Sequence, residues 1–323
     1  MHKFLIICFC FCSGFVTLFA QSEEDRKQWV EMHNWDGITP WNDYIIYFPY
    51  YLGPNALTVP FSEKGLLKDQ FEFEARYDYH WSSGDQTQNI FLNVYIPLLK
   101  NRIALEAYGV LYEHYKMDME TVYERRTRNM SGEGYTFGDV YFGTVLQIIR
   151  DRKFPDLALR LSFRTASGGK LSDARYTDAA GYFFDLSFGK DYLFEDKFIQ
   201  KIRYYGMIGF YVWQLNQTNN MQDDAVLFGL GIDIYAKTFI LSNAIEGYSG
   251  YFGNKEVTIV KKDEPIMARD RPILYRCNIT KTGKHIDLKL AYQLGIHDFT
   301  YQTISFSVIY HLPIKGLYTY SNQ

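Results

Sequence analysis

The chain has 323 residues and a formal net charge of -3, and 18% of its residues are aromatic. A near-neutral chain offers no basic stripe that could cover phosphates, so we expect no nucleic-acid partner. Beyond residue 21 no apolar stretch reaches the roughly 18 residues of a spanning helix, so any residence in a membrane has to be by strands.

Residues 1–20 have the pattern of an export signal. His2 and Lys3 precede an apolar run over residues 4–19, and Ala20 is a small residue at the expected cleavage site. The sequence therefore predicts that the mature protein leaves the cytoplasm. An uncleaved helical anchor is the alternative, although the run is short for a full membrane span.

Three of the four cysteines lie in this leader. Cys8, Cys10 and Cys12 allow a lipoprotein anchor as a competing interpretation, but none has the preceding small residue and spacing of a lipobox. Without the leader, Cys277 is the only thiol. We therefore expect no disulfide and no cysteine metal site.

Residues 21–66 differ in composition from everything that follows. Prolines at positions 40, 49, 54 and 60 forbid a regular strand ladder, and aromatic residues crowd between them. We expect an irregular segment that either enters the lumen of the barrel described next, as a partial plug, or lies on its periplasmic rim. An irregular leader that only packs is the third interpretation.

Residues 67–314 repeat one pattern, in which apolar and polar residues alternate with a period of two. Such alternation puts the two kinds of side chain on opposite faces of a strand. The pattern predicts about twelve strands, with ten or fourteen as alternatives, an even number as in bacterial outer-membrane barrels, followed by a short tail at 315–323. The predicted strands are 71–80, 89–96, 102–116, 139–149, 157–165, 181–189, 201–213, 225–236, 238–247, 272–280, 285–294 and 299–312.

The hairpin over residues 157–189 shows the alternation best. Leu159, Leu161 and Phe163 alternate with Arg160 and Arg164, and a polar loop separates this arm from a second one of the same kind. Arms of about nine to eleven residues with an aromatic outer face are typical of membrane strands. A soluble β-sandwich is the alternative, but we expect an all-β, transmembrane, antiparallel up-and-down barrel in the bacterial outer membrane.

The connections alternate in length along the chain. Residues 82–88, 117–138, 166–180, 214–224 and 248–271 are expected to form outer loops, whereas 151–156 and 281–284 are expected to form tight turns. Long loops face outward in such barrels and short turns face the periplasm. The connection at 190–200 is long for a turn, and the one at 295–298 is short for an outer loop.

If the apolar face is turned to lipid, charges of both signs line the interior. About twelve strands enclose more room than a barrel filled by its own side chains, so we expect a narrow path for a small solute. A sealed wall braced by the same charges is the alternative. The residues expected along the path are Arg76, Arg160, Arg164, Asp185, Arg203, Asp233 and Arg276, and those expected at the mouth are Lys170, Asp173, Arg175 and Asp178.

Enzymatic chemistry finds little support in the sequence. An acyl hydrolase would need a serine beside a histidine on the lipid-facing wall, and only His80 with Ser82 or Ser83, and His114, are candidates. We therefore predict no catalytic residue, cofactor or metal site. The expected partners are membrane lipid, a small-molecule solute and the barrel-assembly machinery, and the oligomeric state stays open.

The central hairpin also carries a motif. Residues 164–168 read RTASG, residues 173–178 read DARYTD, and Gly181, Tyr182 and Asp185 follow. This hairpin resembles the MetA-pathway-of-phenol-degradation family of outer-membrane channels. The resemblance implies a channel-like barrel, in some cases one for the uptake of hydrophobic or aromatic compounds, and it supplies no catalytic residues. The aromatic, proline-rich segment at residues 29–60 and the long loop at 248–271 depart from the family, so the substrate class does not follow from the resemblance.

Overall fold

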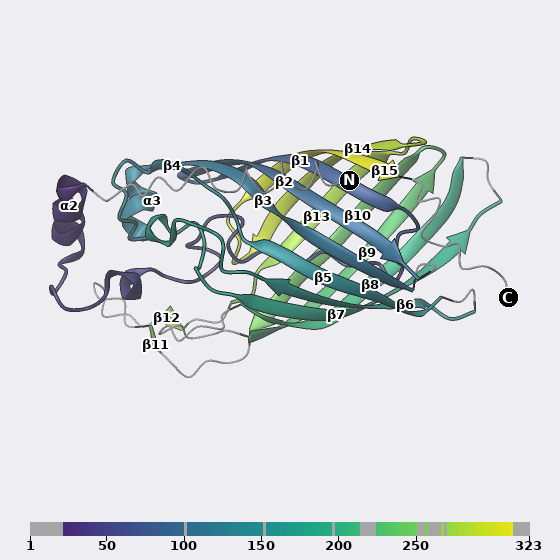
Figure 1. Ribbon diagram of the computed structural model, residues 1–323, viewed down its shortest axis with the longest axis horizontal. Coiled ribbons are helices and arrows are strands. Elements are labelled where there is room, and N and C mark those ends of the chain that lie inside the picture. Colours follow the sequence, from purple (N-terminus) through teal and green to yellow (C-terminus); the bar gives the residue numbers. More distant parts are fainter. Residues whose placement is uncertain are drawn as a thin grey trace, which may run out of the picture.

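The computed structural model describes residues 22–99, 102–150, 153–195, 198–213, 224–250, 256–257, 266–267 and 270–312. Within them, twelve antiparallel strands form a closed barrel (Figure 1). The predicted fold class is confirmed. The expected export signal at 1–20 and tail at 315–323 lie outside the described residues.

Each strand pairs with its neighbour along the chain, and the first and last pair with each other and close the wall. In order, the strands are β1 (Phe71–Ser82), β2 (Asp85–Leu98), β3 (Ile103–Met117), β5 (Val140–Ile149), β6 (Asp156–Arg164), β7 (Gly181–Leu193), β8 (Ile199–Val212), β9 (Asp224–Ala236), β10 (Phe239–Gly250), β13 (Ile273–Lys281), β14 (Ile286–His297) and β15 (Gln302–Leu312). A short strand, β4 (Glu133–Thr136), extends the wall beyond β3, and β11 (Glu256–Val257) pairs with β12 (Ile266–Met267).

Each predicted strand corresponds to one strand of the barrel, but some connections differ. The outer loop expected at 82–88 is wrong, because β1 and β2 continue to a turn at Ser83 and Gly84. Gly84 has a φ of +83°, a conformation that favours glycine. The connection at 190–200 is shorter than expected, since β7 runs to Leu193 and β8 begins at Ile199.

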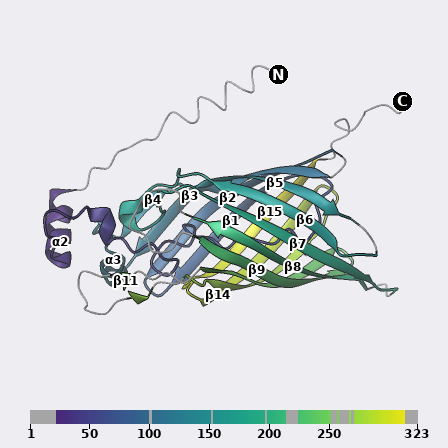
Figure 2. The same ribbon diagram turned by 90° about the horizontal axis from the view of Figure 1, so that it is seen from below.

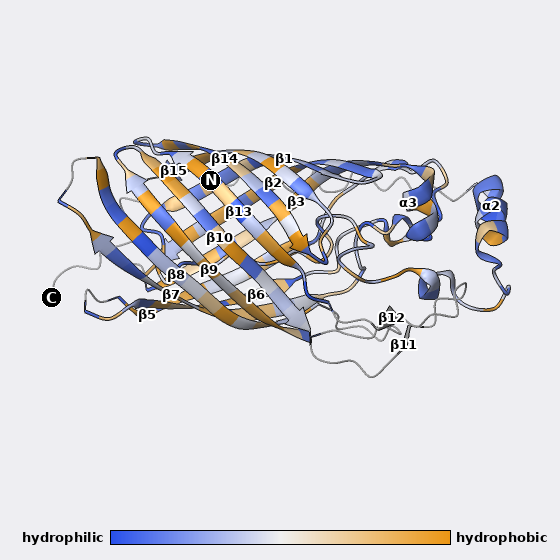
Figure 3. Ribbon diagram, turned by 180° about the vertical axis from the view of Figure 1, so that it is seen from behind, coloured by the Kyte–Doolittle hydropathy of each residue, from blue (hydrophilic) through white to orange (hydrophobic). Residues whose placement is uncertain are grey.

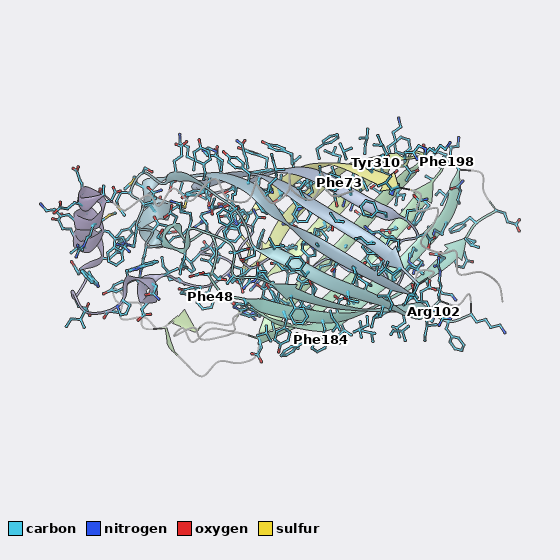
Figure 4. The ribbon with its side chains drawn as sticks, in the orientation of Figure 1. Phe48, Phe73, Arg102, Phe184, Phe198 and Tyr310 are labelled. Atoms are coloured by element: carbon cyan, nitrogen blue, oxygen red, sulfur yellow. The ribbon has the colours of Figure 1, made fainter. Side chains whose placement is uncertain are left out.

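The side chains alternate across the wall as the sequence predicts. In β6 the side chain of Phe163 is 62% exposed on the outside, whereas that of Arg164 is 2% exposed. Phe73, Phe184 and Tyr310 project from the outer face (Figure 4). Figure 3 shows the alternation of hydrophobic and hydrophilic residues along the strands. An apolar exterior on a closed sheet suits a lipid environment.

The two rims of the barrel differ. We call the rim with the connections 118–139 and 165–180 the loop end, and the rim with the turns at 194–198 and 282–285 the turn end. The first connection holds a helix, α3 (Met119–Glu124), besides β4. By the usual orientation of these barrels the loop end faces the exterior of the cell.

The described part of the chain begins at the loop end, at residue 22. Helix α2 (Glu23–His33) is capped by Ser22, whose hydroxyl accepts a hydrogen bond from the Asp25 amide, and η1 (Trp41–Tyr44) follows. Trp29 of α2 donates a hydrogen bond of 3.0 Å to the carbonyl of Arg126, beyond α3. Figures 1 and 2 both show α2 and α3 beyond the same end of the strands. None of the described helices has the length and hydropathy needed to span a membrane.

Residues 52–68 then run through the barrel to the start of β1 at the turn end, and we call them the strap. The strap leaves the lumen by a left-handed turn at Lys64 and Gly65, with φ values of 58° and 76°. A Cβ on Gly65 would lie 2.7 Å from the carbonyl oxygen of Asp156 and 2.7 Å from the amide of Gly189. Only glycine allows this approach to the wall.

Candidate solute pathway in the barrel lumen

Arginines of the wall hold the strap through its backbone carbonyls. Arg164 donates to the carbonyl of Ala56 at 2.6 Å, and Arg276 donates to that of Val59 at 2.7 Å. Arg203 donates to the carbonyl of Lys64 at 2.9 Å. A carbonyl inside a barrel has little water to bind, so a guanidinium stabilises it there.

Ion pairs hold the strap near the turn end. The Lys64 ammonium lies 2.7 Å from a carboxylate oxygen of Asp233. Arg160 donates to Glu63 at 3.0 Å and to Asp185 at 2.8 Å. The pairs of Arg160 are largely buried, so each partner depends on the other to offset the loss of water, whereas the Lys64 side chain is 35% exposed.

A buried polar network lies at the loop end of the lumen. Arg175 donates to Glu113 at 2.9 Å, to Asp85 at 2.7 Å and to Thr87 at 2.7 Å, and its side chain is fully buried. Arg125 donates to the same Asp85 oxygen at 2.7 Å. Two guanidinium groups from two loops therefore meet at one carboxylate of the barrel rim.

An aromatic core lies at the same end. It combines residues of the N-terminal segment, such as Tyr47 and Leu52, with rings from the wall, such as Tyr211 and Trp213. Tyr248 packs against Tyr211 with ring centroids 5.3 Å apart. The core includes five tyrosines, and it gives the strap a fixed starting point.

Burial also shifts the pKa of Asp139, which precedes β5 in this region. Burial raises the pKa of its carboxyl above the usual range, although the Arg164 guanidinium, 3.8 Å away, opposes the shift. The amide of Gly168 donates to the same carboxyl at 2.7 Å. A carboxyl in this position favours its neutral form more than a surface aspartate does.

A cavity of about 540 Å³ remains beside the strap. The strap is bonded mainly to strands β5–β13, and we call this part of the wall the strap side. The cavity also borders β14, β15, β1 and β2, and we call this part of the wall the free side. Side chains of the free side that line the cavity include Glu74, Arg76, Phe91 and Lys289. The volume lies within the range of small-molecule sites.

The seven predicted path residues all lie on the inner wall, but they occupy different places. Arg76, Arg160, Arg203, Asp233 and Arg276 border the cavity. Arg164 and Asp185 are buried at 2% and 0% exposure and do not border it. Five of the seven contact the strap directly. Asp185 contacts Arg160, which in turn contacts the strap, and Arg76 contacts Asp78 of the wall instead. The sequence did not indicate this use of the arginines, because their acceptors are backbone carbonyls.

The four predicted mouth residues lie in the connection 165–180. Asp173 and Arg175 are buried, whereas Lys170 is half-buried and Asp178 is exposed. The hydroxyl of Tyr115 donates to Asp173. This connection therefore folds down into the barrel, and two of its four charged residues, Asp173 and Arg175, make buried hydrogen bonds at the loop end.

The histidines considered for hydrolysis have other partners. The two ring nitrogens of His80 lie 2.8 Å from the Thr303 hydroxyl and 2.7 Å from the Asn89 side-chain oxygen, inside the lumen. On the outside, His114 lies 3.1 Å from Glu133. Neither arrangement brings a serine hydroxyl to an imidazole on the lipid face.

No known family model matches the chain, and no curated protein matches it in sequence. Among solved structures it is similar to the COG4313 outer membrane channel from Pseudomonas putida F1, with a TM-score of 0.52, 11% identity, and coverage of 79% of this chain and 100% of that one. It is less similar to the KdgM porin, with a TM-score of 0.43, 9% identity, and coverage of 74% and 99%. The latter score is too low to support an argument. The first likeness shows the fold, and the chain is a β-barrel of the bacterial outer membrane.

Proposed function

We propose that this protein is an outer-membrane channel for small organic solutes, narrowed by its own N-terminal strap. The observation that carries the proposal is the cavity of about 540 Å³ that borders both the strap and the free side. If the interior charges only stabilised the wall, we would expect them to pair with one another and the side chains to fill the interior without leaving a cavity. Arg76 borders the path directly. The arginines of the strap side set the width of the path indirectly, because they hold the strap in place.

The lining favours solutes that carry polar groups. Glu74, Arg76 and Lys289 border the cavity together with the ring of Phe91. A purely hydrophobic solute would have to strip water from these charges without replacing it. An organic solute with a planar or apolar body and polar substituents could use both kinds of contact.

Two likenesses support a channel. The hairpin at 157–189 resembles the MetA-pathway-of-phenol-degradation family, and the fold is similar to that of a protein named an outer membrane channel. We propose membership of that broad class of uptake channels, with aromatic compounds that carry polar groups as a solute class to test first.

Electrophysiology and swelling assays test the proposal. We expect discrete conductance steps when the purified protein is added to a planar lipid bilayer. We also expect proteoliposomes to swell in small organic solutes faster than in a large oligosaccharide. Folding of the purified barrel is checked by the shift in its electrophoretic migration on heating. A folded protein that gives neither conductance steps nor swelling would contradict the proposed channel.

A surface-interaction barrel is the second candidate. Helices α2 and α3 form a cap beyond the loop end, held by a core that includes Trp29, Tyr44 and Val122. The cap extends well past the wall (Figure 1). Removing residues 22–39 should abolish the binding of intact cells to a partner surface in this case, and leave solute flux as it was.

A further inference from the structure

Two charges of the free side make no ion pair within 4.0 Å in the described part of the chain, Glu74 of β1 and Lys289 of β14. One carboxylate oxygen of Glu74 also makes no hydrogen bond. Glu74 is 9% exposed, Lys289 is half-buried, and both border the cavity. The two charges attract each other at longer range, but neither is in direct contact with an opposite charge that would offset its loss of water.

The strand register brings these residues together with Arg76. Ser307 of β15 lies opposite Arg76 on one side and opposite Lys289 on the other. Glu74 is two residues before Arg76 on β1 and faces the same way. Neighbouring side chains on one face of a sheet lie about 5 Å apart across strands, so the three charges surround one patch of wall.

The other nearby charges already have partners. Lys64 pairs with Asp233 at 2.7 Å, Lys68 with Glu72 at 2.6 Å, and Asp287 with His311 at 3.0 Å. Arg76 contacts Asp78 through Nε at 2.8 Å, and its guanidinium lies 3.9 Å from the centroid of the Phe91 ring. The ring and Asp78 fix the guanidinium, which leaves its outer N–H groups available.

We propose that Lys289, Arg76 and Glu74 form a binding site for a small zwitterionic solute, one that bears a carboxylate and an ammonium group. The carboxylate lies between Lys289 and Arg76, and the ammonium group lies at Glu74. The site rests on the proposed channel, since it recognises a solute on its way through the lumen. The carboxylate of the solute meets two positive charges, and its ammonium group meets a carboxylate that makes no ion pair within 4.0 Å in the described part of the chain.

Swelling assays with two matched solutes test the site. Glutamine is a zwitterion with a neutral side chain, and arabinose is an uncharged solute of similar size. We expect Lys289→Gln and Glu74→Gln each to lower the ratio of glutamine to arabinose permeation by about tenfold, the factor for one charge-assisted hydrogen bond. Lys201→Gln, which removes a lysine paired with Asp191 at 3.3 Å, is the matched control and should leave the ratio unchanged.

A structural role would give a different result. If Glu74 and Lys289 only brace the wall, each single variant lowers the resistance to unfolding, the double variant restores it, and the permeation ratio stays the same. That outcome overturns the site and leaves the channel intact.

A separate binding measurement keeps the two proposals apart. If wild-type protein passes neither solute, the channel fails, and calorimetric titration of glutamine into the detergent-solubilised barrel decides the site. Saturable binding that Lys289→Gln removes supports the site, and the absence of binding overturns it.

Discussion

The strap side and the free side of the lumen are built from the same kind of strand but use their charges differently. On the strap side, guanidinium groups such as those of Arg164 and Arg276 are bonded to strap carbonyls at 2.6 and 2.7 Å. On the free side, Arg76 and Lys289 border an open cavity. The alternation that places a charge inside the barrel therefore does not decide its role, which depends on whether a chain segment lies against it.

This difference assigns separate tasks to the two sides. The strap side has exchanged water for protein contacts, so it contributes stability and narrows the path. The free side keeps charges toward the cavity and can discriminate among solutes. We expect mutations on the strap side to act mainly on folding and conductance, and those on the free side to act mainly on selectivity.

The largest effect is expected from labelling intact cells, because Lys27 and Lys284 lie at opposite ends of the barrel. Lys27 on α2 is exposed at the loop end, and Lys284 is exposed at the turn end. A membrane-impermeant amine reagent should modify Lys27 on intact cells and reach Lys284 only after the cells are opened. Modification of Lys284 alone on intact cells would reverse the orientation.

Removing the strap should raise the conductance several-fold. A variant that lacks residues 22–66 loses the segment that fills the lumen, and Arg164, Arg203 and Arg276 lose their carbonyl partners. We expect wider single-channel steps and a reversal potential shifted toward anion selectivity. A variant that lacks only residues 22–39 is the control, and unchanged conductance in the longer deletion would place the strap outside the path.

Replacing an arginine should cost more stability on the strap side than on the free side. Arg160→Met leaves Asp185 buried without its partner at 2.8 Å, a change expected to cost ~3–5 kcal/mol. Arg76→Met leaves the buried Asp78 with the Asn89 side-chain amide still donating to it at 2.8 Å, so we expect a smaller loss of ~1–3 kcal/mol. Denaturant unfolding of both variants measures the difference, and equal losses would remove the distinction between the sides.

The smallest effect is expected at an ion pair of the strap with a partly exposed partner. Asp233→Asn frees the Lys64 ammonium, whose side chain is 35% exposed, and leaves one more positive charge beside the path. We expect a modest shift toward anion selectivity in reversal-potential recordings, with little change in stability. Asp69→Asn, at an exposed pair with Arg150, should shift nothing.

The strands could be predicted because the required information is local. In β6 the alternation alone identifies Phe163 as outward and Arg164 as inward, and the structure agrees at 62% and 2% exposure. The turn at Ser83 and Gly84 was also present in the sequence, since a glycine between two strands favours a two-residue hairpin. The outer loop expected there overlooked that signal.

The use of the lumen could not be predicted in the same way. The partners of Arg164 are the carbonyls of Ala56 and Trp213, which every residue type carries and no sequence pattern marks. Prolines in the segment indicated only that it forms no ladder. Long-range packing decides that it enters the barrel, and the cavity is the space it leaves.

Zero-length crosslinking of Lys64 to Asp233 tests most directly that the strap lies inside the barrel. A carbodiimide joins an ammonium group to a carboxylate only when the two are in contact, and here they lie 2.7 Å apart, 169 residues apart in the chain. Mass spectrometry of the treated outer-membrane protein should find an intramolecular peptide pair linking residues 64 and 233. If Lys201 is crosslinked to Asp191 while Lys64 stays unlinked, the strap does not occupy the lumen.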